Sequence, residues 1–144
     1  MQVLYEQAGS KEEEKAVIKA VSKTDEIIAA IKLLENGTES IAVTKDEQTF
    51  MLDISSIYYV ESVDKKTFIY TKNNCYEAKY RLYELEEIFN NYFLRCAKAM
   101  IVNIKKIKSV KSEINGRMNA RLLNDENLII ARSYVKELKK RLGI

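Results

Sequence analysis

Short runs of alternating apolar and polar residues cover most of the chain, a pattern that is typical of β-strands. The runs fall at residues 3–7, 16–21, 40–44, 48–53, 56–62, 67–71, 75–80, 99–104, 106–114, 117–123 and 128–131. In one of them Met118, Ala120 and Leu122 alternate with polar residues, which predicts one buried face and one wet, basic face. Most of the chain is therefore expected to form sheet.

Three segments have the apolar spacing of a helix instead. Residues 25–35 carry isoleucines and leucines three or four positions apart, with Thr24 before them as an N-cap and Asn36-Gly37 as a stop. A second short helix is predicted over residues 81–90. The third is predicted over residues 134–141, with Ser133 as its N-cap.

The order of these elements predicts the fold class. Helices do not alternate with strands, so a doubly wound parallel sheet is excluded, and we expect a β-rich, mostly antiparallel α+β protein. Asn115-Gly116 is a strong hairpin signal because both residues tolerate positive φ. We expect a small ββα extension over residues 1–40 and a main domain over residues 41–144.

Composition excludes several classes of chemistry. The 144 residues include no histidine, no proline and four glycines, which argues against a histidine base, a histidine metal site and a glycine-rich phosphate loop. Cys75 and Cys96 are too few for a disulfide scaffold, and we interpret them as reduced thiols. We expect no metal, no cofactor, no small-molecule substrate and no enzymatic activity. The absence of a signal peptide or an apolar run of membrane-spanning length predicts a cytoplasmic protein.

Charge is distributed unevenly along the chain. Residues 1–40 carry five Lys/Arg and eight Asp/Glu, residues 41–90 carry six and nine, and residues 91–144 carry thirteen and four, a balance of +9. A basic block within a folded segment is the pattern expected of nucleic-acid binding. The alternative is the lysine-rich solvated face of an ordinary protein.

From Asp53 onward the sequence resembles a LytTR-type DNA-binding domain. The segments that carry the resemblance stand in the order DISSIYYVESVDKKTFIYT, YRLYELEEIF, FLRCAKAMIVNIKKIKSV and NGRMNARLLNDENLIIARSYVKELKKRLGI. The third contains an Arg-Cys turn followed by an Ile-Val-Asn strand, and the last contains the Ala-Arg step into a closing helix.

The resemblance implies an elongated antiparallel β fold whose inter-strand loops enter successive major grooves of double-stranded DNA. It also implies a transcription regulator that occupies repeated sites, often as a homodimer. Many family members carry a receiver domain upstream, but the first 40 residues are too short for one. The chain is therefore similar to the stand-alone, response-regulator-like bacterial subgroup, which is often paired with a small membrane protein.

Candidate contacts follow from the positions that match the family. The loop after YYVES holds Lys65, Lys66 and Thr67, which can meet phosphates or base edges. Lys98 lies where the family places a second contact. Arg132, before the final helix, matches a third contact and can grip a guanine. The alternatives for these residues are a solvated lysine or a surface salt bridge.

Other residues have more divided interpretations. Arg95 either contacts DNA or supports its loop by bonding backbone carbonyls. Lys105 and Lys106 are candidates for phosphate neutralisation, with a solvated strand end as the alternative. We interpret Asn103 as a turn-stabilising side chain. Ala97 replaces a side chain that is polar in many family members, so only apolar contact with a thymine methyl is left there, and the same holds for Ala99.

Two classes of function remain. The first is a sequence-specific regulator that binds double-stranded DNA. The second is a protein-interaction module whose basic face docks an acidic or membrane-protein partner, with residues 1–40 as a dimerisation or partner-binding element. The nine tyrosines could suggest a platform for single strands, but most of them lie within alternating strands and are expected in the core and at its rim.

Overall fold

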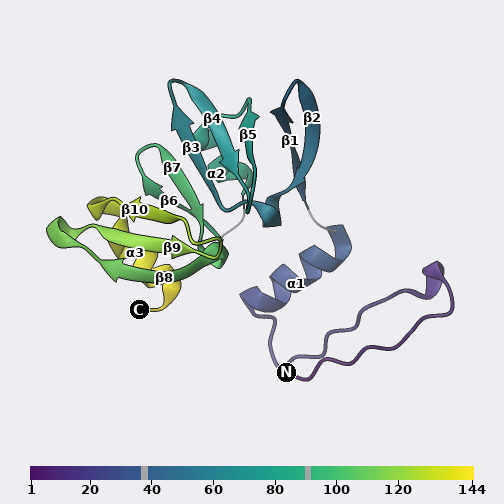
Figure 1. Ribbon diagram of the computed structural model, residues 1–144. Coiled ribbons are helices and arrows are strands. Elements are labelled where there is room, and N and C mark those ends of the chain that lie inside the picture. Colours follow the sequence, from purple (N-terminus) through teal and green to yellow (C-terminus); the bar gives the residue numbers. More distant parts are fainter. Residues whose placement is uncertain (37–38, 90–91) are drawn as a thin grey trace. The chain divides into compact units, whose positions relative to one another are not determined.

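The computed structural model describes residues 1–36, 39–89 and 92–144. It divides the chain into two units, Met1–Thr38 and Glu39–Ile144 (Figure 1). The predicted helix stop at Gly37 and the predicted end of the second helix at Asn90 lie outside the described residues. Within the described residues, no helix is long and apolar enough to cross a membrane.

The first unit contains helix but no strand in its described part. A single 3-10 turn, η1, spans Lys11–Glu13, and α1 spans Asp25–Asn36. The predicted N-cap is confirmed, since the hydroxyl of Thr24 accepts the N–H of Ile27 at 3.3 Å. The strands predicted over residues 3–7 and 16–21 are wrong. Alternation alone cannot make a strand without a neighbouring ladder to bond, and Val3, Leu4 and Tyr5 are exposed.

The second unit contains two sheets, and both are antiparallel, which confirms the predicted fold class. The larger sheet has the strand order β2-β1-β5-β4-β3-β7-β6, and the smaller has the order β10-β9-β8. The strands of the larger sheet are β1 (Ser40–Lys45), β2 (Gln48–Asp53), β3 (Tyr59–Val63), β4 (Lys66–Tyr70), β5 (Cys75–Ala78), β6 (Phe93–Ala97) and β7 (Met100–Asn103). Those of the smaller sheet are β8 (Ile107–Ser112), β9 (Met118–Leu122) and β10 (Asn127–Ile130).

Two helices and three single 3-10 turns complete this unit. They are α2 (Leu82–Ile88), α3 (Arg132–Leu142), η2 (Ile54–Ser56), η3 (Ile104–Lys106) and η4 (Ile114–Gly116). α3 begins earlier than predicted, because Ala131 is its N-cap and Ser133 lies inside its first turn. Strand β6 was missed, since Arg95 and Cys96 were interpreted as a turn. The turn in fact follows two residues later, at Lys98-Ala99.

Two separate clusters of buried side chains hold the second unit together. The first joins the larger sheet to α2 through residues such as Val43, Ile69 and Leu85. The second joins the smaller sheet and α3 to strands β6 and β7 through residues such as Leu122 and Leu138. Because α3 packs over β6, its N-terminus is held close to the end of that strand. The predicted core or rim positions of the strand tyrosines are confirmed for Tyr58, Tyr59, Tyr70, Tyr76 and Tyr80.

Tight turns join several neighbouring strands. The β1–β2 turn is made by Asp46 (φ 51°) and Glu47 (φ 63°), and the β3–β4 turn has the same form at Asp64 (φ 50°) and Lys65 (φ 67°). Two consecutive residues with positive φ define the type I′ hairpin turn, which suits the twist of paired strands. The hairpin predicted at Asn115-Gly116 is confirmed, with φ values of 71° and 77°.

Candidate nucleic-acid interface

The β3–β4 turn presents two lysines to solvent. Val63 and Lys66 face each other as the last paired residues of the two strands, so Asp64 and Lys65 form the tip. Lys65 and Lys66 are both exposed. The side chain of Lys65 starts from a left-handed backbone, which an ordinary residue adopts only at a cost of about 1–2 kcal/mol. The turn therefore fixes the backbone position from which this exposed side chain extends.

The β6–β7 turn carries Lys98, and the side chain of Arg95 supports this turn through hydrogen bonds. One guanidinium nitrogen of Arg95 donates to the carbonyl oxygen of Lys98 at 2.5 Å, and its Nε donates to Glu86 of α2 at 2.9 Å. A second nitrogen of the same guanidinium forms an ion pair with Glu86. Arg95 thus ties the β6–β7 turn to α2, which is the supporting arrangement considered for it from the sequence.

Arg132 is the first residue of α3 and lies beside the β8–β9 turn. The N–H of Ala131 donates to the carbonyl oxygen of Cys96 at 2.9 Å, which fixes the start of α3 against the end of β6. A Cβ added at Gly116 would lie 2.8 Å from Cδ of Arg132. The glycine therefore leaves room for the stem of the arginine, whose side chain is exposed.

Backbone hydrogen bonds link these three segments at one end of the sheet. The N–H of Ser62 donates to the carbonyl oxygen of Ala99 at 2.8 Å, which joins the β3–β4 hairpin to the β6–β7 turn. The bond between Ala131 and Cys96 then joins that turn to α3. In Figure 1 the tips of the β3–β4, β6–β7 and β8–β9 hairpins lie along the same side of the unit. We call Lys65, Lys66, Lys98 and Arg132 the loop surface.

Thr67 does not belong to the loop surface. Only 4% of the residue is exposed, because β4 directs Thr67 and Ile69 to the core face and Lys66 to the opposite face. The structure therefore argues against Thr67 as a DNA contact: the predicted loop does lie between β3 and β4, but this side chain points inward.

Lys105 and Lys106 lie at the other end of the sheet. Strand β7 runs away from the β6–β7 turn, and its four residues separate the two lysines from Lys98 by about 14 Å. The ammonium of Lys105 lies 4.4 Å from the ring centre of Tyr92, and that of Lys106 lies 5.3 Å from the ring centre of Tyr58. The structure therefore does not bring these two candidates together with the loop surface.

Asn103 stabilises the chain at the end of β7 that is remote from the loop surface. Its amide nitrogen donates to the carbonyl oxygen of Ile57 at 2.9 Å, and its side-chain oxygen accepts the N–H of Lys105 at 3.0 Å. The residue is 3% exposed. Its predicted role as a turn-stabilising side chain is confirmed.

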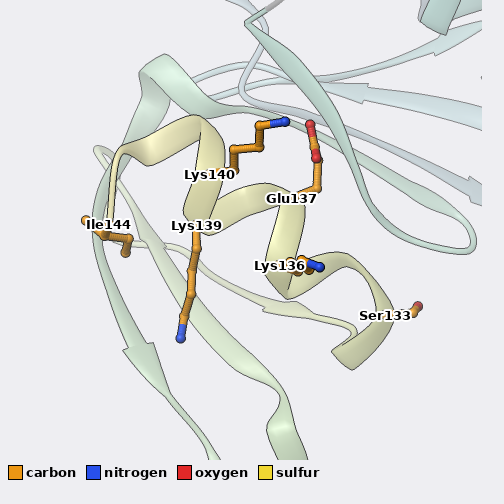
Figure 2. A pocket seen from close by; sticks show the side chains of 6 residues that line it. All are labelled: Ser133, Lys136, Glu137, Lys139, Lys140 and Ile144. Carbon is orange, nitrogen blue, oxygen red and sulfur yellow. The ribbon is translucent and has the colours of Figure 1, made fainter.

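Two further cations continue the line that begins at Arg132. Lys136 and Lys139 follow Arg132 at spacings of four and seven residues in α3, so the three share one face of the helix. Lys136 and Lys139 are exposed and help to line a shallow hollow; Figure 2 shows their side chains with the other four that line it, which are those of Ser133, Glu137, Lys140 and Ile144. These two lysines were not among the predicted DNA contacts. Their spacing from Arg132 was the available signal.

Cys96 lies directly beneath the β6–β7 turn and is chemically inert there. It is fully buried, and this burial raises the pKa of its thiol to about 12, so the group is neutral at physiological pH. Its Sγ lies 3.7 Å from the carbonyl oxygen of Met100. Among the described residues, no group of three His, Cys, Asp or Glu side chains could hold a metal ion.

The sequence is also similar to known proteins. The family described as LytTr DNA-binding domain matches residues 47–143. The transcriptional regulatory protein YpdB of Escherichia coli K12 is 32% identical over 124 residues, which cover 85% of this chain and 50% of YpdB. An uncharacterised HTH-type transcriptional regulator of Staphylococcus aureus is 30% identical over 99 residues, which cover 69% of this chain and 67% of that protein.

The fold is also similar to a solved structure. A LytTr DNA-binding domain from Bacillus cereus superposes with a TM-score of 0.70 at 26% sequence identity, over 75% of this chain and 100% of that domain. The chain spans about half the length of YpdB. The matched residues 47–143 include both sheets, α2 and α3, except for β1. This protein belongs to the LytTR DNA-binding domain family.

Proposed function

We propose that this protein is a transcription regulator that binds double-stranded DNA in a sequence-specific manner. In this proposal the inter-strand loops enter the major groove at repeated sites. The observation that carries the proposal is the pair of backbone hydrogen bonds, Ser62 to Ala99 and Ala131 to Cys96, that hold three cationic segments at one end of a rigid sheet. A fixed frame keeps the cations in register with one another, which a flexible basic tail cannot do.

The residues of the loop surface would have different roles. Arg132 would read a base, since a guanidinium can donate to O6 and N7 of one guanine and discriminate by about 1–3 kcal/mol. Lys65, Lys66 and Lys98 would neutralise phosphates or reach a guanine edge. Lys136 and Lys139 would extend phosphate binding along the groove, since they lie on the same face of α3 as Arg132. No catalytic step and no cofactor is required.

Ala99 gives the β6–β7 turn a second kind of contact. It is exposed at the tip of that turn, next to Lys98. A methyl side chain cannot donate or accept a hydrogen bond, but it can pack against the C5-methyl group of thymine. The turn would thus combine one cation with one apolar contact, and we expect thymine near the position that Lys98 approaches.

Selection of duplexes from a randomised pool tests the proposal. The wild-type protein should enrich a defined motif, and Arg132→Ala should relax the preference at one position by about 1–3 kcal/mol. Lys105→Ala is the matched control, because it removes one positive charge at the far end of the sheet. It should leave the motif unchanged. An unchanged motif with Arg132→Ala would refute the base-reading role, and enrichment of no motif by the wild-type protein would refute the function.

A second candidate function rests on the first unit. Val3, Leu4, Tyr5 and Leu33 are all more than half exposed, which leaves an unusual amount of apolar surface for so short a segment. This favours a role for residues 1–40 in binding a membrane-protein partner or in dimerisation, while the basic face of residues 91–144 would dock an acidic partner. Competition between a duplex and an acidic protein for the same preparation separates the two functions. Displacement of the duplex would indicate that the basic face docks proteins.

The proposed site of action is the cytoplasm, where a regulator reaches chromosomal DNA. The proposed state on DNA is a homodimer at two repeated half-sites. Two copies on one duplex bind more tightly than either alone, because the second binding event occurs at a high effective concentration. Binding should also weaken steeply with salt. The logarithm of the affinity should fall by about 0.9 for each log unit of salt and each phosphate neutralised.

A further inference from the structure

We propose that strand β2 is the surface through which two copies of this chain associate, by pairing antiparallel with β2 of the second copy. β2 is the outermost strand of the larger sheet and pairs only with β1. Five of its six residues are exposed, and the sixth, Leu52, is half-buried. Its outer row of backbone N–H and C=O groups is therefore available to another strand.

The other outer strands of the two sheets are protected against such pairing. β6 has a register shift between Arg95 and Ala97 and is covered by α3. β8 has a register shift after Ile107 and carries Lys108 and Lys111, and charged lysines on an outer strand discourage pairing. β10 lies against β6. Among the outer strands that the structure describes, β2 and β10 combine an unbroken register with the absence of lysine, arginine, proline and glycine. Of these two, β10 also contacts β6, which leaves β2 as the candidate for pairing.

The hairpin geometry shows which backbone groups of β2 are free. In a two-residue hairpin the residues that flank the turn exchange hydrogen bonds, and bonded and non-bonded pairs then alternate. The bond from the N–H of Ile54 to the carbonyl oxygen of Glu39, at 3.0 Å, confirms this alternation at the far end of the hairpin. The N–H and C=O groups of Thr49, Met51 and Asp53 therefore point away from β1.

This alternation selects one register for the two-fold pair. Only a pairing centred on Met51 bonds all three outward-pointing residues, with Thr49 opposite Asp53 of the second copy and Met51 opposite itself. A shift by two residues in either direction leaves one of the three without a partner in the strand. Such a two-fold interface is isologous, which is the commonest arrangement in homodimers.

The side chains are compatible with the same register. Phe50 and Leu52 lie on the core face of the hairpin, since they pair with Val43 and Ile41 of β1. In the dimer Phe50 would meet Leu52 of the second copy and continue the apolar face across the two-fold axis. Met51, which is 67% exposed, would meet its own equivalent. Asp53, the one charged residue of β2, would face Thr49, so no like charges oppose each other.

The area of the contact limits its strength. A single pair of six-residue strands buries less than the roughly 1,200–2,000 Å² of a standard stable interface. The dimer should therefore be weak and concentration-dependent in solution and should be favoured when two copies occupy one DNA. Its biological role rests on the proposed function, but the pairing itself is independent of DNA.

Sedimentation velocity of the whole chain without DNA provides the first test. The sedimentation coefficient should rise with protein concentration, and Met51→Lys should abolish the rise. Ile129→Lys is the matched control, because Ile129 is also an exposed apolar strand residue, 48% exposed, but lies on β10. It should leave the rise intact. A concentration-independent wild-type protein, or equal effects of the two variants, would overturn the proposal.

Disulfide cross-linking tests the register. Residues opposite each other in a bonded antiparallel pair have Cα atoms about 5.5 Å apart, within the range of about 4.4–6.8 Å that a disulfide spans. In a Cys75→Ser background, Met51→Cys should therefore form a cross-linked dimer on mild oxidation. Thr49→Cys should not, because the two copies of residue 49 would be about 14 Å apart along the strands.

The outcomes separate this inference from the proposed function. Equal cross-linking at residues 49 and 51 would refute the register, and no cross-linking at residue 51 would refute the surface, including the case in which another segment of the chain covers β2. Loss of association by Met51→Lys with retained binding of a single half-site would support the inference. Failure to bind any duplex by a chain that still dimerises would instead refute the proposed function alone.

Discussion

Replacing Lys65 with glycine should stabilise the protein and weaken its binding to DNA at the same time. Lys65 has φ 67° at the second position of the β3–β4 turn. A left-handed backbone costs a non-glycine residue about 1–2 kcal/mol in the folded state. Glycine avoids this cost, but its greater conformational entropy stabilises the unfolded state by about 0.4–1 kcal/mol. The difference predicts an increase in the free energy of unfolding of about 0.5–1 kcal/mol. The substitution would also place an Asp-Gly pair, which this turn type prefers, at the tip of the hairpin.

Binding should change in the opposite direction, because the substitution removes a cation from the loop surface. If Lys65 neutralises one phosphate, the slope of log affinity against log salt should become shallower by about 0.9. Urea denaturation measures the stability, and fluorescence anisotropy of a labelled duplex at several salt concentrations measures the slope.

The β1–β2 turn supplies the control for this experiment. Glu47 occupies the equivalent position, with φ 63°, and carries no positive charge. Glu47→Gly should give a similar gain in stability with no loss of affinity. If Lys65→Gly gained stability but kept the wild-type salt slope, the β3–β4 turn would not lie at the DNA. If both variants lost stability, the assignment of the two turns as type I′ would be refuted.

Three further substitutions or modifications test other parts of the structure. Gly116→Ala should cost about 1–2 kcal/mol of stability through its φ of +77°, and its Cβ should displace Arg132 and weaken DNA binding; thermal denaturation and anisotropy measure the two effects. Asn103→Ala should cost about 1–3 kcal/mol because it leaves buried backbone groups without partners, and a urea titration that shows no loss would contradict the hydrogen-bonding role. A thiol reagent should label exposed Cys75 in the folded protein and Cys96 only after unfolding, as followed by mass spectrometry, since burial raises the pKa of Cys96 to about 12.

Much of the second unit could be predicted from the sequence because its local signals agree with one another. Apolar alternation located β9, and Asn115-Gly116 located the turn before it. Agreement between strand pattern and turn chemistry is what makes a segment predictable from its own residues. The order of these segments also carried the family resemblance.

The errors arose where structure depends on residues that are distant in the sequence. Residues 3–7 and 16–21 alternate like strands, but a strand forms only where another strand satisfies its hydrogen bonds. The inward direction of Thr67 depends on how β4 pairs with its neighbours, which the sequence of the loop does not specify. The separation of Lys105 from Lys98 likewise depends on the direction of β7, and proximity in the sequence was a poor guide to it.

The loops of the candidate site could be predicted from the sequence, but several of the residues that belong to the site could not. The resemblance to the family led to Lys98 and Arg132, and the structure has Lys98 in the β6–β7 turn and Arg132 at the start of α3. Lys136 and Lys139 follow Arg132 at helical spacing, but the helix was predicted to begin at residue 134, and only the observed start of α3 at Arg132 places all three on one helix face.

The two separate cores have a consequence for the geometry of the DNA sites. The β3–β4 hairpin that carries Lys65 contributes Val60 and Ile69 to the first core and Tyr59 to the second, whereas α3, which carries Arg132, is anchored in the second. The span between these two proposed contacts is therefore set by the packing of β3, β7 and β6 where the cores meet. If the proposed contacts hold, substitutions of buried residues such as Val102 should alter the preferred length of an operator without changing any of the proposed DNA contacts.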